Sequence, residues 1–508
     1  MTTTPDLPAA RTPGGRPAYG GAAEPSILKM AAPIVLSFTM RSLFTFVDMF
    51  YASTLGDKAV AVVGALSMPF EFLMIATWVG VSTGLTSNLS RAMGAREGAR
   101  IEQLLAVSRT IVRVLVPVFA ALGAAAYFGA DHLGLPPGVA PLFAVYVGVL
   151  VGGSAVSSFW SIIPDSIVKA HHDTRSTMWA GIWSNLINVG LNTLFLFVFH
   201  WGVFGIAFST VLGRFGGLVY ALRKAAHHEA ARQASGLDTD PTLDPHPLRS
   251  FLSLALPSST TYGLMAVETG LVNWLLARQP NATESIAAYG IYSRVLQFAA
   301  MPIIAAAVAV LPYVARRFGE GNIRAIRDGM RQILLVAVVY CVGLVTPALL
   351  VGGPWLARAL AESPLTAELA TVALALCPLA CLAMVPFSLC RPAFEGLQRG
   401  RPGLAMAVFR YTILTIPFAF AGMKAADLLG RPPLYGLLAG LIGASGLASA
   451  VFFIWMRRFL GDLEAQERAA APQPRPAGQP GAARFSAPAT LPSEPTAPLS
   501  ARQDAPED

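Results

Sequence analysis

Two carboxylates interrupt stretches of sequence that are otherwise apolar and long enough to cross a lipid bilayer. Asp48 lies within the apolar stretch 27–53, and Glu268 lies at a similar depth in the stretch 251–278. A charge at the centre of a membrane helix costs at least about 2.5 kcal/mol, so it needs a partner or a water-filled cavity. A carboxylate in such a place can bind a proton or a sodium ion, or attract a cationic solute. We therefore expect Asp48 and Glu268 to couple ions, with a structural ion pair as the alternative.

Other charged side chains fall in the same apolar stretches and extend this set. Arg41 and Glu71 lie near the middle of adjacent stretches, which predicts a buried ion pair between them. Arg41 precedes Asp48 by two helical turns, so both lie on one face of a helix. Arg294, at the depth of Glu268 on the next stretch, is placed to neutralise that carboxylate. We expect these residues to line a cavity or to contact a substrate.

Three asparagines form a further polar feature. Asn185, Asn188 and Asn192 follow the spacing i, i+3, i+7 in the stretch 177–199, so they form a stripe on one helix face. Such a stripe can line a cavity, and hydrogen bonds between helices explain it equally well. Three more arginines lie deep in apolar stretches, and the sequence assigns them no role: Arg113, Arg214 and Arg410.

The chain lacks the sequence patterns of an enzyme or of an ATP-driven pump. It contains neither a phosphate-binding Gly-Lys-Ser/Thr loop nor a His-Glu-x-x-His zinc motif. We expect no enzymatic activity, no cofactor and no metal site other than a sodium ion at Asp48. A proton or sodium gradient is the energy source that remains. The cysteines, all in or at the ends of apolar stretches, predict small buried residues rather than a disulfide framework: Cys341, Cys377, Cys381 and Cys390.

The composition is that of a polytopic membrane protein. Of the 508 residues 54% are hydrophobic and 13% are charged, and the mean hydropathy is +0.55. A soluble domain needs more charge on its surface. Stretches of about 20 apolar residues, enough to cross a bilayer, recur along the chain. These predicted spans are 27–53, 59–85, 104–128, 141–165, 177–199, 203–222, 251–278, 285–312, 332–352, 367–391, 403–425 and 433–456.

The basic residues indicate how the spans are oriented. The net charge is +8, but Lys and Arg lie in short segments between spans, which argues against nucleic acid as a partner. One set of loops carries roughly three times as many Lys and Arg residues as the opposite set. In membrane proteins, Lys and Arg accumulate in cytoplasmic loops. We therefore expect a multi-pass protein of the cell (plasma or inner) membrane with both termini in the cytoplasm. The basic loops contain Arg91, Arg96, Arg100, Lys169, Arg175, Arg223, Lys224, Arg249, Arg316, Arg317, Arg324, Arg327, Arg331, Arg399 and Arg401.

The two halves of the chain are related by an internal repeat. Four short motifs recur at one offset: Met-Ala-Ala-Pro33 and Leu-Ala-Leu-Pro257, Val60-Ala-Val-Val-Gly64 and Ile286-Ala-Ala-Tyr-Gly290, Arg91-Ala-Met-Gly94 and Arg316-Arg-Phe-Gly319, and Lys169-Ala-His-His-Asp-Thr-Arg175 and Glu395-Gly-Leu-Gln-Arg-Gly-Arg401. Because six spans return the chain to its starting side, the repeat is parallel, with its axis along the membrane normal. The sequence thus predicts an all-α membrane protein with two pseudo-symmetric six-helix lobes around a central cavity. The predicted parts are a disordered cytoplasmic N-terminus (1–25), an N-terminal lobe (26–223), a cytoplasmic inter-lobe loop (224–249), a C-terminal lobe (250–460) and a disordered cytoplasmic tail (461–508).

Several motifs, taken in order over residues 26–460, resemble the multidrug and toxic compound extrusion (MATE) transporters. Pro33 is followed by the pair Val47-Asp48 and a Leu55-Gly56 turn. The motifs that follow are Ala59-Val-Ala-Val-Val-Gly64, Ser90-Arg-Ala-Met-Gly94-Ala-Arg-Glu97, and Asp173-Thr-Arg175 with Met178 and Asn188 downstream.

This resemblance implies an antiporter that exports small organic, cationic or amphiphilic compounds in exchange for protons or sodium ions by alternating access. It implies Asp48 as the coupling residue, and we expect the chain to function as a monomer in the bilayer. The alternative is a flippase for lipid-linked saccharides of the same superfamily. This alternative stays open because Arg41, Arg294 and Arg410 are suitable ligands for the pyrophosphate of such a lipid. A scaffold or receptor that transports nothing is disfavoured, because it needs neither an internal repeat nor buried carboxylates.

Overall fold

The computed structural model describes residues 25–136, 138–236, 240–279 and 281–470, apart from the side chains of 41–46, 65 and 470. All regular secondary structure in this part of the chain is helical. The first half contains α1 (Ile27–Ser53), α2 (Asp57–Ala61), α3 (Met68–Ala95), α4 (Gly98–Gly129), α5 (Ala140–Val147), α6 (Ser154–Ala170), α7 (Thr174–Thr193) and α8 (Gly202–Ala234). The second half contains α9 (Pro247–Leu276), α10 (Ala282–Gly319), α11 (Ile323–Tyr340), α12 (Thr346–Leu360), α13 (Pro364–Gly396), α14 (Gly400–Val408), α15 (Thr415–Leu428) and α16 (Pro433–Ala470).

Short π-helical turns extend some of these helices or join them into longer rods. They are η1 (Val62–Leu66), η3 (Gly148–Gly153), η4 (Leu194–Val198), η5 (Cys341–Val345) and η6 (Phe409–Leu414), while η2 (Ala130–Leu133) is a 3-10 turn after α4. Each predicted span corresponds to one long helix or to one such rod. A π turn widens the helix locally and often lies at a functional site.

Polar residues explain where two of the helices begin. The carboxylate of Asp173 accepts a hydrogen bond from the backbone N–H of Ser176 at 3.0 Å, at the start of α7. The side-chain oxygen of Asn322 accepts one from the N–H of Ala325 at 3.0 Å, at the start of α11. Each side chain satisfies an N–H group that the first helical turn leaves without a partner, and so fixes the start of its helix.

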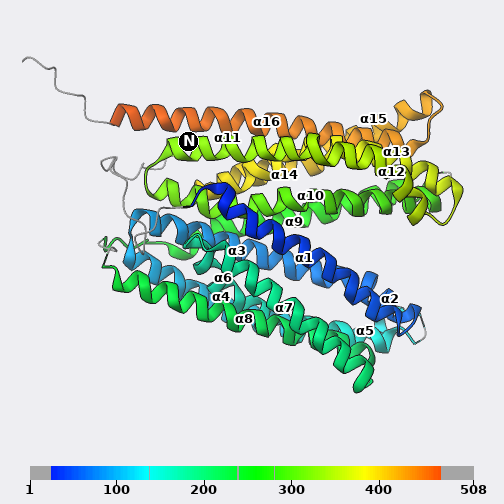
Figure 1. Cartoon of the computed structure of the whole chain (residues 1–508), viewed down its shortest axis with the longest axis horizontal. Coiled ribbons are helices and arrows are strands. Elements are labelled where there is room, and N and C mark those ends of the chain that lie inside the picture. Colours follow the sequence, from blue (N-terminus) through cyan, green and yellow to red (C-terminus); the bar gives the residue numbers. More distant parts are fainter. Residues whose placement is uncertain (1–24, 137, 237–239, 280, 471–508) are drawn as a thin grey trace, which may run out of the picture.

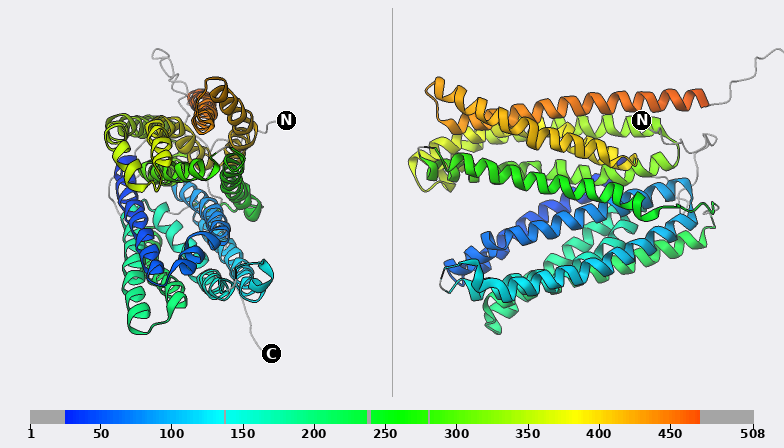
Figure 2. Two further views of the ribbon diagram at one scale, coloured as in Figure 1. Left: turned by 90° about the vertical axis from the view of Figure 1, so that its right-hand side faces the viewer. Right: turned by 180° about the vertical axis from the view of Figure 1, so that it is seen from behind.

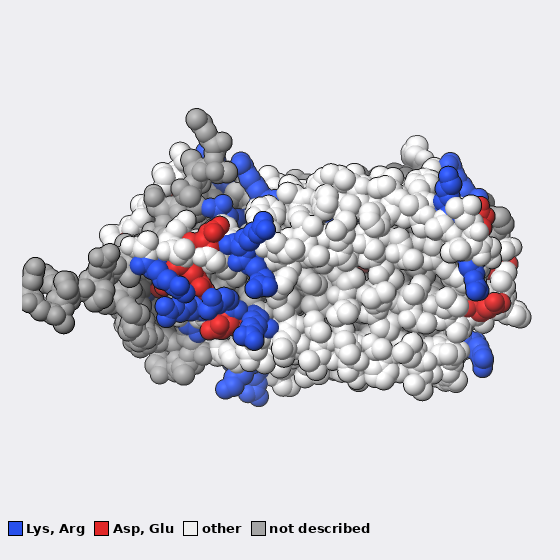
Figure 3. Space-filling model, turned by 90° about the horizontal axis from the view of Figure 1, so that it is seen from above, with Lys and Arg blue, Asp and Glu red and all other residues white. Residues whose placement is uncertain are grey.

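On the face drawn in Figure 3, a broad uncharged belt separates the charged residues, which gather at the two ends. Within the described residues, ten helices are long and apolar enough to cross a membrane, and a shorter apolar segment, Ile27–Met40, belongs to α1. These features confirm the predicted all-α membrane fold. We call the end of the belt that carries Arg91, Arg100, Arg316 and Arg317 the basic end.

The helices form two lobes, one from each half of the chain (Figures 1 and 2). The ribbons of the lobes lie together at the basic end and diverge toward the end that holds α2 and α5 (Figure 1). Helix α1 contributes to both lobes, since Ile27 and Met30 belong to a core of the second lobe. Near its other end, Tyr51 and Ala52 belong to the core of the first lobe.

Two helices continue beyond the ends that the sequence predicts. Helix α8 continues to Ala234 through the first part of the predicted inter-lobe loop. Arg232 stabilises this extension, because it forms ion pairs at 2.7 Å with Glu229 one turn away and with Glu102 of α4. Helix α16 continues to Ala470, past the predicted lobe boundary at 460. There Glu464 pairs with Arg327 of α11 at 2.8 Å. The predicted N-terminus up to residue 24 and the tail from 471 lie outside the described residues.

Candidate functional site

Asp48 is the centre of a polar cluster inside the first lobe. The Nδ2 atom of Asn192 on α7 donates a hydrogen bond to Asp48 Oδ1 at 2.9 Å. Asn188 lies one turn earlier, and its amide satisfies its neighbours when its oxygen and nitrogen are exchanged; the nitrogen then donates to the same oxygen at 3.2 Å. In that orientation the Asn188 oxygen accepts from the backbone N–H and the hydroxyl of Thr210 on α8. Two of the three predicted asparagines therefore hold the predicted carboxylate.

The packing of α7 against α8 fixes the positions of these asparagines. Asn192 is fully buried, and its oxygen accepts a hydrogen bond from the hydroxyl of Ser209 on α8. Gly213 allows the two helices to approach closely, because a Cβ atom there would lie 2.6 Å from the carbonyl oxygen of Ser184. Asn185, the third asparagine of the stripe, is half-buried, and it is not among the described residues that hydrogen-bond Asp48. The sequence analysis missed Ser209, whose only signal is its place in an apolar span.

Two charged side chains of the described residues, Arg214 of α8 and Glu71 of α3, lie near Asp48. Glu71 accepts a hydrogen bond from the hydroxyl of Ser67 at 3.2 Å. The side chain of Arg41 lies outside the described residues, so the predicted pair of Arg41 and Glu71 stays a prediction.

Glu268 is the centre of a second cluster, inside the second lobe. The hydroxyl of Thr415 on α15 donates to Glu268 Oε1 at 2.8 Å. The cation that acts on Glu268 is Arg410 of η6, and not Arg294 as expected from depth along the sequence. Arg294 is exposed on α10, and it has no ion-pair partner among the described residues. The difference has a simple cause, since rotation about the helix axis decides which way a side chain points, and depth does not report it.

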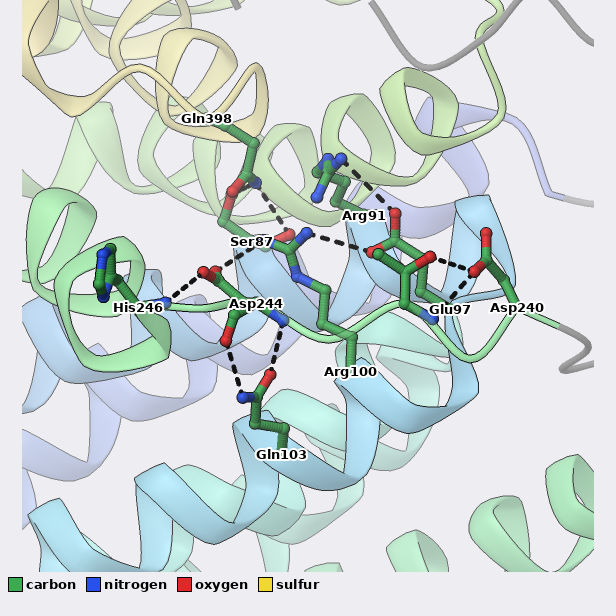
Figure 4. A network of polar contacts seen from close by, with 10 residues as sticks. Ser87, Arg91, Glu97, Arg100, Gln103, Asp240, Asp244, His246 and Gln398 are labelled. Carbon is green, nitrogen blue, oxygen red and sulfur yellow. Dashed lines mark hydrogen bonds and ion pairs between the residues drawn. The ribbon is translucent and has the colours of Figure 1, made fainter. Parts of the chain in front are cut away.

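Contacts at the basic end join the two lobes (Figure 4). Ser87 of α3 donates to the backbone oxygen of Glu395 on α13 at 2.6 Å. Gln398, which follows α13, donates to the Ser87 hydroxyl at 2.8 Å. Glu395 is itself paired with Arg391 at 2.7 Å. The lobes are therefore closed against each other at this end.

The segment between the lobes is also anchored at the basic end. Arg100 of α4 forms an ion pair with Asp244 at 3.1 Å, and the Gln103 amide exchanges two hydrogen bonds with the Asp244 backbone. Burial would raise the pKa of Asp244, but hydrogen bonds from Ser250 and from the N–H of His246, together with Arg100, lower it. An ionised Asp244 thus binds the segment to α4.

His172 lies between the lobes in the loop that follows α6. It is buried, and its Nε2 atom is 3.4 Å from the carbonyl oxygen of Pro312 on α10. Burial and, to a smaller extent, the nearby cations Arg316 and Arg317 together lower the pKa of His172 to about 3. At the next residue, Asp173, burial would raise the pKa, but hydrogen bonds from His228 and Ser176 outweigh this effect and lower the pKa to about 2. His172 is thus a neutral inter-lobe contact at neutral pH.

The fold, with a polar cluster around a half-buried carboxylate in each lobe, defines a two-lobed polytopic membrane protein. A family model described as MatE matches residues 33–194 and 257–421. The chain therefore belongs to the MATE transporter family, whose members are transporters and not enzymes. The two matched segments begin at Pro33 and Pro257, the prolines at which the predicted repeat begins.

Curated relatives agree with this assignment. "Probable multidrug resistance protein YoeA" of Bacillus subtilis is 26% identical over 324 residues, which are 60% of this chain and 66% of the relative. An FAD transporter of Shewanella oneidensis is 21% identical over 434 residues, 82% of this chain and 92% of the relative. The matches span 66% and 65% of the length of YoeA and of a second Bacillus subtilis relative, "Probable multidrug resistance protein YpnP".

Solved structures share the fold at low sequence identity. An outward-facing multidrug resistance MATE transporter has a TM-score of 0.76 and 21% identity, over 86% of this chain and 96% of that one. A MOP superfamily transporter of Pyrococcus furiosus, described as having a binding pocket of reverse polarity, has a TM-score of 0.75 and 20% identity over the same shares. These likenesses confirm the two-lobed arrangement of the helices.

Proposed function

We propose that this protein is a secondary antiporter that exports small organic compounds in exchange for protons or sodium ions. The observation that carries the proposal is the carboxylate of Asp48, held by Asn192 and Asn188 inside a membrane-crossing lobe. Hydrogen bonds from the described residues reach its Oδ1 atom. The Oδ2 atom is then available to accept a proton or a sodium ion.

The closed basic end supports transport by alternating access. We propose that the basic end faces the cytoplasm, because Lys and Arg accumulate on that side of membrane proteins. The structure then corresponds to a form whose lobes are closed toward the cytoplasm. Binding of a cation at Asp48 and release of the substrate on the outer side would precede opening of the contacts at Ser87 and His172. Glu268 is the second ion-coupling candidate of this proposal.

The second candidate function is a flippase for lipid-linked saccharides. It is favoured by Arg410, a half-buried cation inside the second lobe and a suitable ligand for pyrophosphate. The relatives also leave the charge of the substrate open, since one is named an FAD transporter and one has a pocket described as reversed in polarity. Substrates of both charges and a lipid-linked saccharide therefore belong in one test.

The experiment uses the purified protein in lipid vesicles. A pH gradient and then a sodium gradient is imposed, and the movement of a fluorescent organic cation, a fluorescent organic anion and a lipid-linked saccharide is followed. The proposal expects one of the two organic dyes to move against its concentration under one gradient, and to stop when an ionophore collapses that gradient. Movement of the lipid-linked saccharide alone would instead establish the flippase.

A further inference from the structure

Arg410 has an unusual environment for an arginine inside a membrane-crossing lobe. It lies in the π turn η6, where its guanidinium carbon is 4.6 Å from the ring centre of Tyr411 and 4.9 Å from that of Phe387. Its Nη1 atom donates a hydrogen bond to the Tyr411 hydroxyl at 3.0 Å. Among the ion pairs of the described residues, none involves Arg410. This cation is therefore held by aromatic rings rather than by a carboxylate.

A second arginine in the same lobe shows the contrast. Arg391 of α13 forms an ion pair with Glu395 at 2.7 Å and donates to the Ser258 hydroxyl at 3.1 Å. Its charge is compensated within the protein. A guanidinium has five N–H donors, and Arg410, which is half-buried, uses one of them on the protein. The remaining donors of Arg410 are available to a ligand.

Glu268 is the carboxylate on which Arg410 acts, but it does not close the site. Its Oε1 atom is held by Thr415 at 2.8 Å, and it acts on Arg410 from beyond ion-pair distance. A fixed guanidinium with free donors and a more distant carboxylate suits a ligand that carries its own anionic group. Arginine presents paired donors that match the two oxygens of a carboxylate or a phosphate.

We infer that the second lobe binds the exported compound through an anionic group on Arg410, which the buried rings of Phe387 and Tyr411 hold in place. The substrate class is thus an organic anion that carries a carboxylate or a phosphate. This inference rests on the proposed function and differs from the cationic class that the family resemblance implies. Glu268 provides the counter-charge while the site is empty.

Two dyes with the same ring system and opposite charge test this inference. Fluorescein is an anion at mildly alkaline pH, and a rhodamine ester is a cation with the same xanthene core. Binding of each to the full-length protein in lipid nanodiscs is measured by fluorescence anisotropy, with no gradient present. We expect the wild type to bind fluorescein more tightly than the rhodamine ester. Arg410→Gln should weaken fluorescein binding about tenfold or more without weakening rhodamine binding.

Three further variants make the result specific. Arg410→Lys keeps the charge and should recover part of the fluorescein affinity. Glu268→Gln removes the competing negative charge and should tighten fluorescein binding. Arg358→Gln removes an exposed arginine of the same lobe, on α12, and should change the binding of neither dye. Retention of a monodisperse, folded protein is checked for each variant by size-exclusion chromatography.

The outcomes separate this inference from the proposed function. Preference of the wild type for the rhodamine ester, or equal loss of both dyes in Arg410→Gln, would overturn the anionic site. Gradient-driven transport that depends on Asp48 would still stand in that case. Conversely, Arg410-dependent fluorescein binding in a protein that moves no solute under any gradient would support the site and contradict the antiporter.

Discussion

A Cβ atom added at Gly94 of α3 would lie 2.2 Å from the carbonyl oxygen of Arg316 on α10. The relationship is reciprocal, because a Cβ atom at Gly319 of α10 would lie 2.1 Å from the carbonyl oxygen of Arg91 on α3. These residues belong to the motifs that recur in the two halves of the chain. Equivalent glycines of the repeat therefore pack against each other and bring the two backbones into contact at the basic end.

Replacement of Gly94 by alanine should open the basic end. The methyl group cannot fit without separating α3 from α10, and overpacking of this kind costs typically about 1–3 kcal/mol. The closed form should become about tenfold less populated or more relative to the open form. Electron–electron distance measurements between spin labels at the exposed positions Ala226 of α8 and Arg324 of α11 would show longer distances.

Gly263→Ala is the matched control for this substitution. A Cβ atom at Gly263 of α9 meets nothing within 4 Å, so the label distances should stay those of the wild type. Labelling is selective because the native cysteines, all within the described residues, are buried. Unchanged distances in both Gly94→Ala and Gly319→Ala would contradict the role of this contact in closure.

The closed basic end should weaken as the pH falls, because of His172. Its pKa is about 3 in the closed form, and on separation of the lobes it returns to its ordinary value near 6.5. Between these pH values the open form binds one more proton than the closed form. The contribution of His172 to the stability of the closed form is therefore full above about pH 6.5 and decreases as the pH falls toward 3. At about pH 5.5 the free energy that favours the closed form is lower by about 1.4 kcal/mol. The distances between the spin labels should therefore lengthen.

His172→Gln should remove most of this pH dependence, since glutamine carries no titrating group. The remainder arises from His171, whose pKa is also lowered by burial. His200→Gln, at an exposed position, serves as the control and should leave the dependence intact. The same response to pH in His172→Gln and wild type would show that another group controls closure.

Asn192→Ala should impair ion coupling without unfolding the first lobe. Asp48 would lose its 2.9 Å hydrogen bond, and hydrogen bonds to charged groups contribute about 1.5–3 kcal/mol. Gradient-driven transport in vesicles should fall about tenfold or more. Asn185→Ala, on the same helix but away from Asp48, should transport as the wild type does. Equal activity of the two variants would remove Asn192 from the coupling site.

The spans and the repeat could be predicted because both depend on local sequence. Apolar length identifies a span whatever it packs against, and the prolines at 33 and 257 begin equivalent helices in both halves. The ends of α8 and α16 could not be predicted, since contacts with other helices hold them beyond the bilayer. The pair of Arg232 and Glu102, for example, joins α8 to α4.

The candidate site was predictable as a set of residues but not as a set of contacts. Asp48, Asn188 and Asn192 stood out because each is polar in an apolar span, yet their hydrogen bonds depend on how α1 packs against α7. Arg294 and Arg410 lie in similar apolar surroundings along the sequence. Arg294 is exposed, whereas Arg410 is half-buried and acts on Glu268, a difference that arises from the rotation of each helix in the folded lobe.

The most direct test of the account compares Asp48→Asn with the wild type in the same vesicles. The substitution keeps the size and hydrogen bonding of the side chain and removes its ability to bind a proton or a sodium ion. We expect the variant to bind the dye that the wild type transports, but not to move it against a concentration difference under either gradient. Gradient-driven transport at the wild-type rate in Asp48→Asn would contradict the assignment of Asp48 as the coupling residue.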